Sequence, residues 1–194
     1  IEWPKPGRKV DPKTDFAVVS QSVLDRPGLL QAIRAREAAP PVVFVHGYNY
    51  NFQEALFRLA QLKTDSNLDG TPVLFSWPSL AALPAYVADK EAATYSRDAL
   101  ADLLSDMVRA RKGEVDVFAH SMGGWLTVEA LRQLRLQGKG DVLDRLRVIM
   151  AAPDIDEDVF TAQLDVIGRM RIPITILVAP DDRALQVSSI LGAG

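Results

Sequence analysis

Short apolar runs alternate with amphipathic stretches along this chain. The runs carry β-branched and aromatic residues at successive positions, a pattern typical of strands that are covered on both faces. We predict six strands on this basis, at residues 16–19, 42–45, 73–75, 115–119, 148–152 and 174–178.

The stretches between these runs have helical spacing. Asn51 and Glu54 form an N-cap pair at the start of a helix whose apolar positions repeat every three to four residues. The same repeat predicts helices over residues 95–108 and 125–136, the second closed by Gly138. Alternation of strands and helices predicts an α/β fold, with a mostly parallel sheet and helices on both faces.

The domain organisation follows from the same pattern. Residues 1–13 are rich in proline and charge and predict an extended N-terminal arm, and residues 14–194 predict one domain. The chain begins with Ile1, which fits a removed signal peptide or a trimmed chain equally well, so the compartment (cytoplasmic, periplasmic or secreted) is not indicated.

Composition excludes several classes of protein and site. The net charge is −3 and the basic residues are scattered, so we expect no nucleic-acid partner. No apolar run is long enough to predict a membrane span. The chain has no cysteine, which excludes disulfides, thiolate metal sites and a cysteine nucleophile. It also lacks metal-ligand spacing, a phosphate loop and a dinucleotide fingerprint, so we expect no cofactor and no metal.

The stretch Val-Asp-Val-Phe-Ala-His-Ser-Met-Gly-Gly at residues 115–124 carries the clearest chemistry. An apolar strand ends at Ala119, Ser121 follows, and a helix begins a few residues later. A serine on so sharp a turn needs small residues two positions to either side, here Ala119 and Gly123, as in a nucleophile elbow. We therefore predict Ser121 as a catalytic nucleophile.

A second strand-to-turn junction predicts the oxyanion hole. Such a hole needs the N–H of the residue after the nucleophile, here Met122, and one N–H from the loop after an earlier strand. In that loop we choose Tyr48, with Asn49 as a reserve that also contacts substrate. His46 precedes Gly47 at the end of the strand, where we expect it to brace the loop rather than to act as a base.

Five motifs in this order carry a family resemblance: His-Gly-Tyr-Asn, Phe-Ser-Trp-Pro-Ser, Ala-His-Ser-Met-Gly, Ala-Pro-Asp-Ile-Asp and Asp-Asp-Arg-Ala-Leu. Over about residues 40–190 the chain resembles a bacterial branch of the α/β-hydrolase superfamily, catalogued as a domain of unknown function with esterase-like features. The resemblance implies a serine esterase-type site and says little about the substrate.

The catalytic acid is expected after the strand at residues 174–178, because this fold has the order Ser, then Asp or Glu, then His. Asp181 and Asp182 both fit, and the family's Asp-Arg-Ala-Leu segment favours Asp182. Asp154 and Asp156 are a rival acid site, although Asp154 with Glu157 also fits a helix-capping box, and capping is the role that we predict for it. Capping or turn formation is the alternative role for Asp181 and Asp182 too.

The catalytic base is not evident in these residues. His46 and His120 are the chain's two histidines, and neither follows Asp182. We expect the base in a position after Gly194, with a further strand and helix, so that the domain is C-terminally incomplete. The 194-residue chain by itself is then expected to hydrolyse esters very slowly or not at all.

These residues together predict a carboxylic-ester hydrolase that forms an acyl-enzyme on Ser121. Trp77, with Phe52 and Tyr86, is a candidate for an acyl pocket, and core packing is its alternative role. Residues 79–94 leave no room for a long lid, so we expect a small-molecule ester with a small or medium acyl chain. An acyltransferase and a catalytically silent binding domain of the same fold are the alternatives. The oligomeric state is not indicated.

Overall fold

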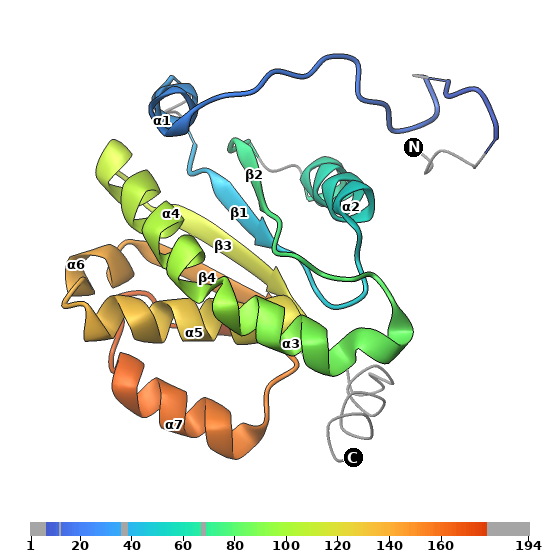
Figure 1. The fold of residues 1–194 in the computed structure, drawn as a ribbon. Helices are drawn as coiled ribbons and strands as arrows, with labels where there is room; N and C mark the ends of the chain where they lie inside the picture. The colour runs from blue at the N-terminus through green and yellow to red at the C-terminus, as the bar shows by residue number, and fades with distance from the viewer. Residues whose placement is uncertain (1–6, 12, 36–38, 67–68, 178–194) are drawn as a thin grey trace.

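The computed structural model describes residues 7–11, 13–35, 39–66 and 69–177. In these residues a parallel sheet has the strand order β2-β1-β3-β4-β5, and the first four strands can be followed in Figure 1. The strands are β1 (Val42–Val45), β2 (Pro72–Phe75), β3 (Val115–His120), β4 (Leu146–Ala151) and β5 (Thr175–Leu177). All the strand pairings are parallel, so the carboxyl ends of the strands meet at one edge of the sheet.

Five of the six predicted strands are confirmed, within two residues at the ends that the structure describes. The strand predicted at residues 16–19 is wrong. Phe16 stacks on Phe57 with ring centroids 5.9 Å apart, whereas Val18 and Val19 are exposed and no regular structure forms. β-Branched residues favour an extended backbone, but a strand also needs a neighbour to complete its hydrogen bonds.

Seven α-helices lie in the described residues. They are α1 (Arg26–Arg34), α2 (Phe52–Asp65), α3 (Tyr86–Tyr95), α4 (Arg97–Ala110), α5 (Met122–Leu136), α6 (Gly140–Leu143) and α7 (Glu157–Ile167), and a 3₁₀ turn, Leu83–Ala85, leads into α3. None of these helices is long and apolar enough to cross a membrane.

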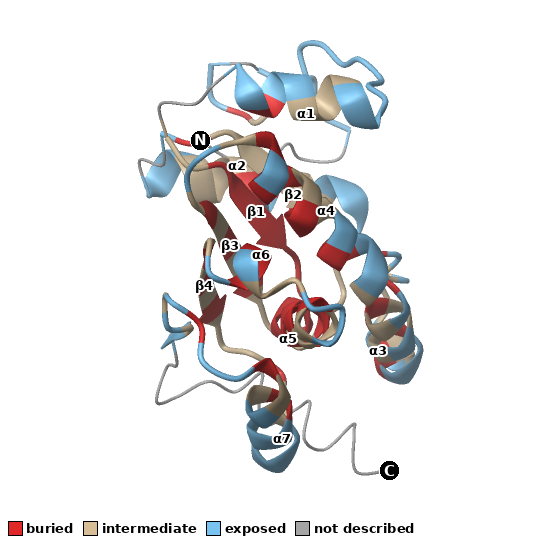
Figure 2. Ribbon diagram, turned by 90° about the vertical axis from the view of Figure 1, so that its left-hand side faces the viewer, coloured by how far each residue is buried: buried red, intermediate tan, exposed pale blue. Residues whose placement is uncertain are grey.

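The helices cover both faces of the sheet. Val45 and Val117 belong to one face and pack in the core with residues of α4 and α5. Phe44 and Phe118 point to the other face, where they line a cavity together with Leu62 of α2. Figure 2 shows β1 and most of α5 buried, with exposed residues along the outer sides of α3 and α7, while β3 alternates between buried and intermediate residues. The expected α/β architecture with helices on both faces is confirmed.

The helix predictions are confirmed in part. Asn51 caps α2, with hydrogen bonds of 2.9 Å in both directions between Asn51 and Glu54, which is the capping box expected from the sequence. The stretch at residues 95–108 is α4, but the chain is helical before it as well, since α3 runs from Tyr86 and breaks only at Ser96. Pattern analysis missed α3 because it is rich in alanine and has no side-chain N-cap.

Candidate active site

Ser121 occupies a sharp turn between β3 and α5. Its backbone has φ 51° and ψ −123°, a conformation that residues other than glycine rarely adopt. The Ser121 N–H donates to the Ala151 carbonyl at 3.0 Å, and the Ser121 carbonyl accepts from the Gly124 N–H at 2.8 Å. The strained strand-to-helix turn is therefore present as predicted, and the half-buried Ser121 lies at the carboxyl edge of the sheet.

Close packing explains why small residues flank Ser121. A Cβ atom at Gly123 would lie 2.3 Å from the Val45 carbonyl oxygen and 2.6 Å from that of His46. A Cβ atom at Gly124 would lie 2.8 Å from the Cβ atom of Pro153. The first turn of α5 thus touches the end of β1 on one side and the loop after β4 on the other.

The loop after β1 lies directly against the elbow. A Cβ atom at Gly47 would lie 3.0 Å from the Cβ atom of Ser121. Met122 is the first residue of α5, and an N–H in that position has no acceptor within its own helix. The structure therefore brings together Ser121, Met122 and the loop that carries Tyr48.

Tyr48 is held by its side chain. Its hydroxyl donates to the Ala82 carbonyl at 3.2 Å and also to that of Leu83, and its ring meets the Tyr86 ring edge-on at 5.4 Å. Asn49 follows with φ 60°, a left-handed conformation that turns the chain sharply. These contacts tie the loop after β1 to the segment before α3.

His46 and Trp77 both belong to the core below this loop. The His46 side chain is 1% exposed and stacks on the Trp77 indole, with centroids 4.8 Å apart. Its Nδ1 lies 2.9 Å from the Gly47 carbonyl oxygen, and the Trp77 indole N–H donates to the His46 carbonyl at 2.9 Å. This is the bracing geometry expected of His46, and for Trp77 it matches core packing rather than an acyl pocket.

Burial lowers the pKa of His46, because the charged imidazolium is poorly solvated there. In the unfolded chain His46 binds a proton near the ordinary pKa of about 6.5. In the folded protein it binds that proton only at a lower pH. Stability is full above that pH and falls as the pH is lowered through it, by at most about 1.4 kcal/mol per pH unit. His46→Gln is expected to remove this dependence of the free energy of unfolding on pH. Urea unfolding at pH 7.5 and pH 5.5 measures it, and equal slopes in the two proteins would contradict the assignment.

The structure gives Asp154 a role other than the helix capping that the sequence predicted. The predicted capping role is wrong, because Asp156 is the N-cap of α7 and accepts from the Asp158 and Val159 N–H groups at 3.0 and 3.1 Å. The buried Asp154 carboxylate instead accepts a 2.7 Å hydrogen bond from the Tyr86 hydroxyl.

Asp154 also contacts the elbow through its backbone. The Asp154 N–H donates to the Ser121 carbonyl at 3.2 Å. Burial and the hydrogen bond to Asp154 raise the pKa of the Tyr86 phenol, so the hydroxyl remains a donor. The pair Tyr86–Asp154 thus joins α3 to the backbone of Ser121, a connection that sequence analysis did not find.

The other candidate residues have different surroundings. His120 borders the loop after β1, since a Cβ atom at Gly47 would lie 2.9 Å from its Nδ1, and it lines the cavity on the α2 face, where its ring centroid is 6.3 Å from that of Tyr50. Phe52 is 63% exposed at the start of α2. Asp181 and Asp182 lie outside the described residues. Within the described residues no three His, Asp or Glu side chains are grouped so that they could hold a metal ion.

Comparison with known proteins shows the family to which the chain belongs. No curated protein matches the chain. A solved structure described as "Crystal structure of esterase PE8" aligns with 81% of this chain and 94% of that chain, at 15% sequence identity and a TM-score of 0.45. Residues 26–194 match the family model described as "Alpha/beta hydrolase of unknown function (DUF900)". The resemblance found in the sequence motifs is thereby confirmed, and the chain belongs to this family of α/β hydrolases.

Proposed function

We propose that this hydrolase is a serine carboxylic-ester hydrolase with Ser121 as its nucleophile. The observation that carries the proposal is the strained turn at Ser121, which presents the serine at the N-terminus of α5. Strained backbone of this kind is found at catalytic sites, where the surrounding structure compensates for its cost. The close packing of Val45, Gly47 and Pro153 against the elbow supplies that compensation here.

The reaction proceeds by acyl transfer. The Ser121 hydroxyl oxygen attacks the ester carbonyl as its proton passes to a histidine base, and the oxyanion accepts hydrogen bonds from the Met122 and Tyr48 N–H groups. The alcohol leaves with the proton and an acyl-enzyme remains. Water then attacks the acyl-enzyme, returns a proton to Ser121 through the same base, and releases the acid. Asn49 contacts the bound substrate.

We assign the acid that orients the base to Asp182. Asp154 is the rival, and its packing supports a different role. Its carboxylate accepts the Tyr86 hydrogen bond and its N–H holds the Ser121 carbonyl, so both ends of the residue stabilise the elbow. We place neither His46 nor His120 as the base, since His46 is buried against Trp77 and the His120 ring lies on the α2 face.

A fluorophosphonate probe tests the proposal on the full-length protein. Such probes react with an activated serine and leave a covalent adduct. We expect one adduct, on the peptide that contains Ser121, and loss of labelling after heat denaturation. A folded protein that remains unlabelled would overturn the hydrolytic function and favour the alternative of a silent binding domain.

A further inference from the structure

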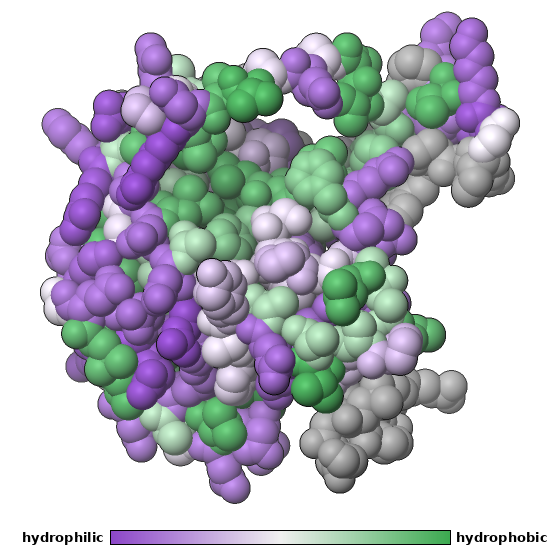
Figure 3. Space-filling view, in the orientation of Figure 1, coloured by the Kyte–Doolittle hydropathy of each residue, from purple (hydrophilic) through white to green (hydrophobic). Residues whose placement is uncertain are grey.

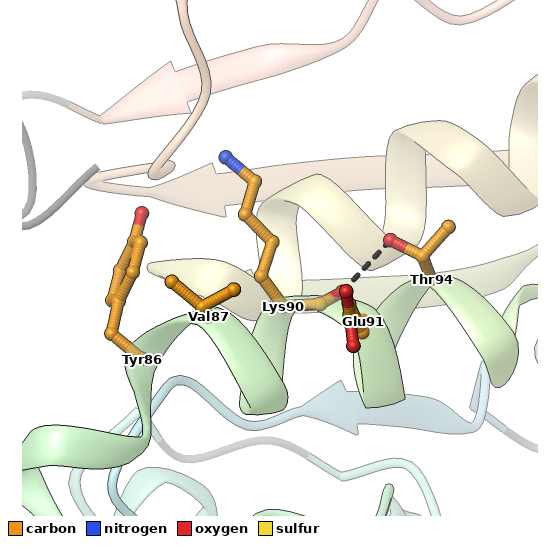
Figure 4. A pocket seen from close by; sticks show the side chains of 5 residues that line it. All are labelled: Tyr86, Val87, Lys90, Glu91 and Thr94. Carbon is orange, nitrogen blue, oxygen red and sulfur yellow. Dashed lines mark hydrogen bonds between the residues drawn. The ribbon is translucent and has the colours of Figure 1, made fainter. Parts of the chain in front are cut away.

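A cavity of about 440 Å³ runs along α3 beside the elbow. It is lined by one side of that helix, from Tyr86 and Val87 through Lys90 and Glu91 to Thr94. Figure 4 shows Tyr86 and Lys90 extending from the same side of the helix, with Val87 between them. Apolar and charged groups therefore share one wall.

Two separate contacts place this cavity next to Ser121. Tyr86 lines it at one end and donates to Asp154, whose N–H holds the Ser121 carbonyl. Lys90 lies one helical turn further, ~6 Å along the axis. Its ammonium nitrogen is 4.6 Å from the centre of the Trp125 ring, and Trp125 is itself one turn beyond Ser121 on α5.

The charges around the cavity favour an anion at Lys90. Among the residues that the structure describes, no carboxylate forms an ion pair with Lys90, a half-buried residue whose ammonium lies over an indole face. The nearby N-terminus of α5 adds partial positive charge. Three acidic groups are nearby: the exposed Glu91, the buried Asp89, which accepts from the Ser79 hydroxyl and the Leu80 N–H, and Asp154, whose carboxylate is bonded to Tyr86.

The approach to the cavity is apolar. Leu80, Leu83 and Val87 are exposed by 65%, 70% and 62% in the segment that leads into it. Figure 3 shows hydrophobic surface gathered over this segment and the start of α3. An apolar chain can lie along this surface and reach the ammonium of Lys90 at its end.

We propose that the α3 cavity is a substrate subsite, and that Lys90 selects esters whose chain ends in a carboxylate. This inference rests on the proposed hydrolysis at Ser121 and adds the substrate class. The chain extends from the ester carbonyl at the elbow, past Tyr86 and Val87, and its carboxylate pairs with Lys90. The bond broken is still the ester bond, and the distal carboxylate takes no part in the chemistry.

Matched esters test the inference on the full-length protein. Mono-4-nitrophenyl adipate is compared with 4-nitrophenyl hexanoate, and 4-carboxyphenyl hexanoate with phenyl hexanoate, so that the carboxylate is placed on each side of the ester bond. In Lys90→Gln the kcat/KM ratio of charged to neutral ester should fall about fivefold to tenfold in at least one pair. High salt should reduce the wild-type ratio, because the pair is partly exposed.

Two further variants control for general effects. Lys90→Arg retains the cation and should restore most of the ratio. Lys112→Gln removes an exposed lysine that precedes β3, at the sheet edge opposite Ser121, and should leave the ratio unchanged. Equal ratios in wild type and Lys90→Gln for both pairs would overturn the inference.

Binding of unreactive amides separates this inference from the hydrolytic proposal. Measured by calorimetry, adipic acid monobutylamide should bind wild type about fivefold to tenfold more tightly than it binds Lys90→Gln. N-butylhexanamide, which has no carboxylate, should bind the two proteins with equal affinity. If wild type hydrolyses none of the esters but still prefers the charged amide, hydrolysis at Ser121 is overturned and the cavity is an anion-binding site only. Turnover with no preference in either assay would overturn the role of Lys90 alone.

Discussion

Replacing Ser121 with alanine is expected to lower turnover of an activated ester by about 10⁴- to 10⁶-fold in the full-length protein, because in the proposed mechanism this removes the nucleophile and leaves only binding and the oxyanion donors. Folding should be unaffected. Alanine retains the Cβ atom already present in the strained turn, and the hydrogen bonds that hold this turn come from backbone groups. The rate of 4-nitrophenol release and the urea midpoint measure the two effects.

Ser76→Ala is the matched control for this substitution. Ser76 also follows a strand at the carboxyl edge of the sheet, but it is exposed at the end of β2 and starts no helix. Its removal is expected to change turnover by less than about twofold, as for surface changes away from a special feature. Wild-type turnover in Ser121→Ala would show that another group is the nucleophile.

Gly123→Ala is expected to have a large effect on folding. The new Cβ atom would lie 2.3 Å from the Val45 carbonyl oxygen and 2.6 Å from that of His46, and both are backbone atoms of a central strand and its loop. Relieving these overlaps requires α5 to move away from β1. We expect a loss of about 3 kcal/mol or more in the free energy of unfolding, measured by urea unfolding, or loss of soluble protein.

Gly140→Ala provides the comparison. A Cβ atom there would meet only Nη1 of Arg135, at 3.0 Å, and that group lies at the end of a flexible side chain. The change in stability should stay within about 1 kcal/mol. Stability of Gly123→Ala equal to that of Gly140→Ala would mean that the elbow is less tightly packed against β1 than the geometry indicates.

The parts of the site that the sequence predicted are local ones. The turn at Ser121 follows from an apolar strand, small residues at positions 119 and 123, and a helix, all within a few residues. The capping box of Asn51 and Glu54 is equally local, and both of its hydrogen bonds form. In such cases the neighbouring residues are sufficient to predict the backbone.

The pair Tyr86–Asp154 was missed because its partners are 68 residues apart, and no periodic pattern links them. The capping prediction for Asp154 failed because Asp156, two residues later, has the same capping chemistry and forms the N-cap of α7. Residues 16–19 have the composition of a strand but no strand beside them. Each of these outcomes depends on which distant segments meet in the folded chain.

The sheet order has a consequence for how the site is assembled. The elbow belongs to a β-α-β unit in which β3 pairs with β4, beginning with Val115 opposite Leu146. The loop of Tyr48 is positioned by β1, whose pairing of Val42 with Asp116 closes a much longer stretch of chain. Loop closure costs roughly 0.6 kcal/mol more for each doubling in length. A folding path that forms the nearer pairing first has the Ser121 turn in place before the loop of Tyr48, so these two parts of the candidate site meet only when the longer stretch between β1 and β3 has closed.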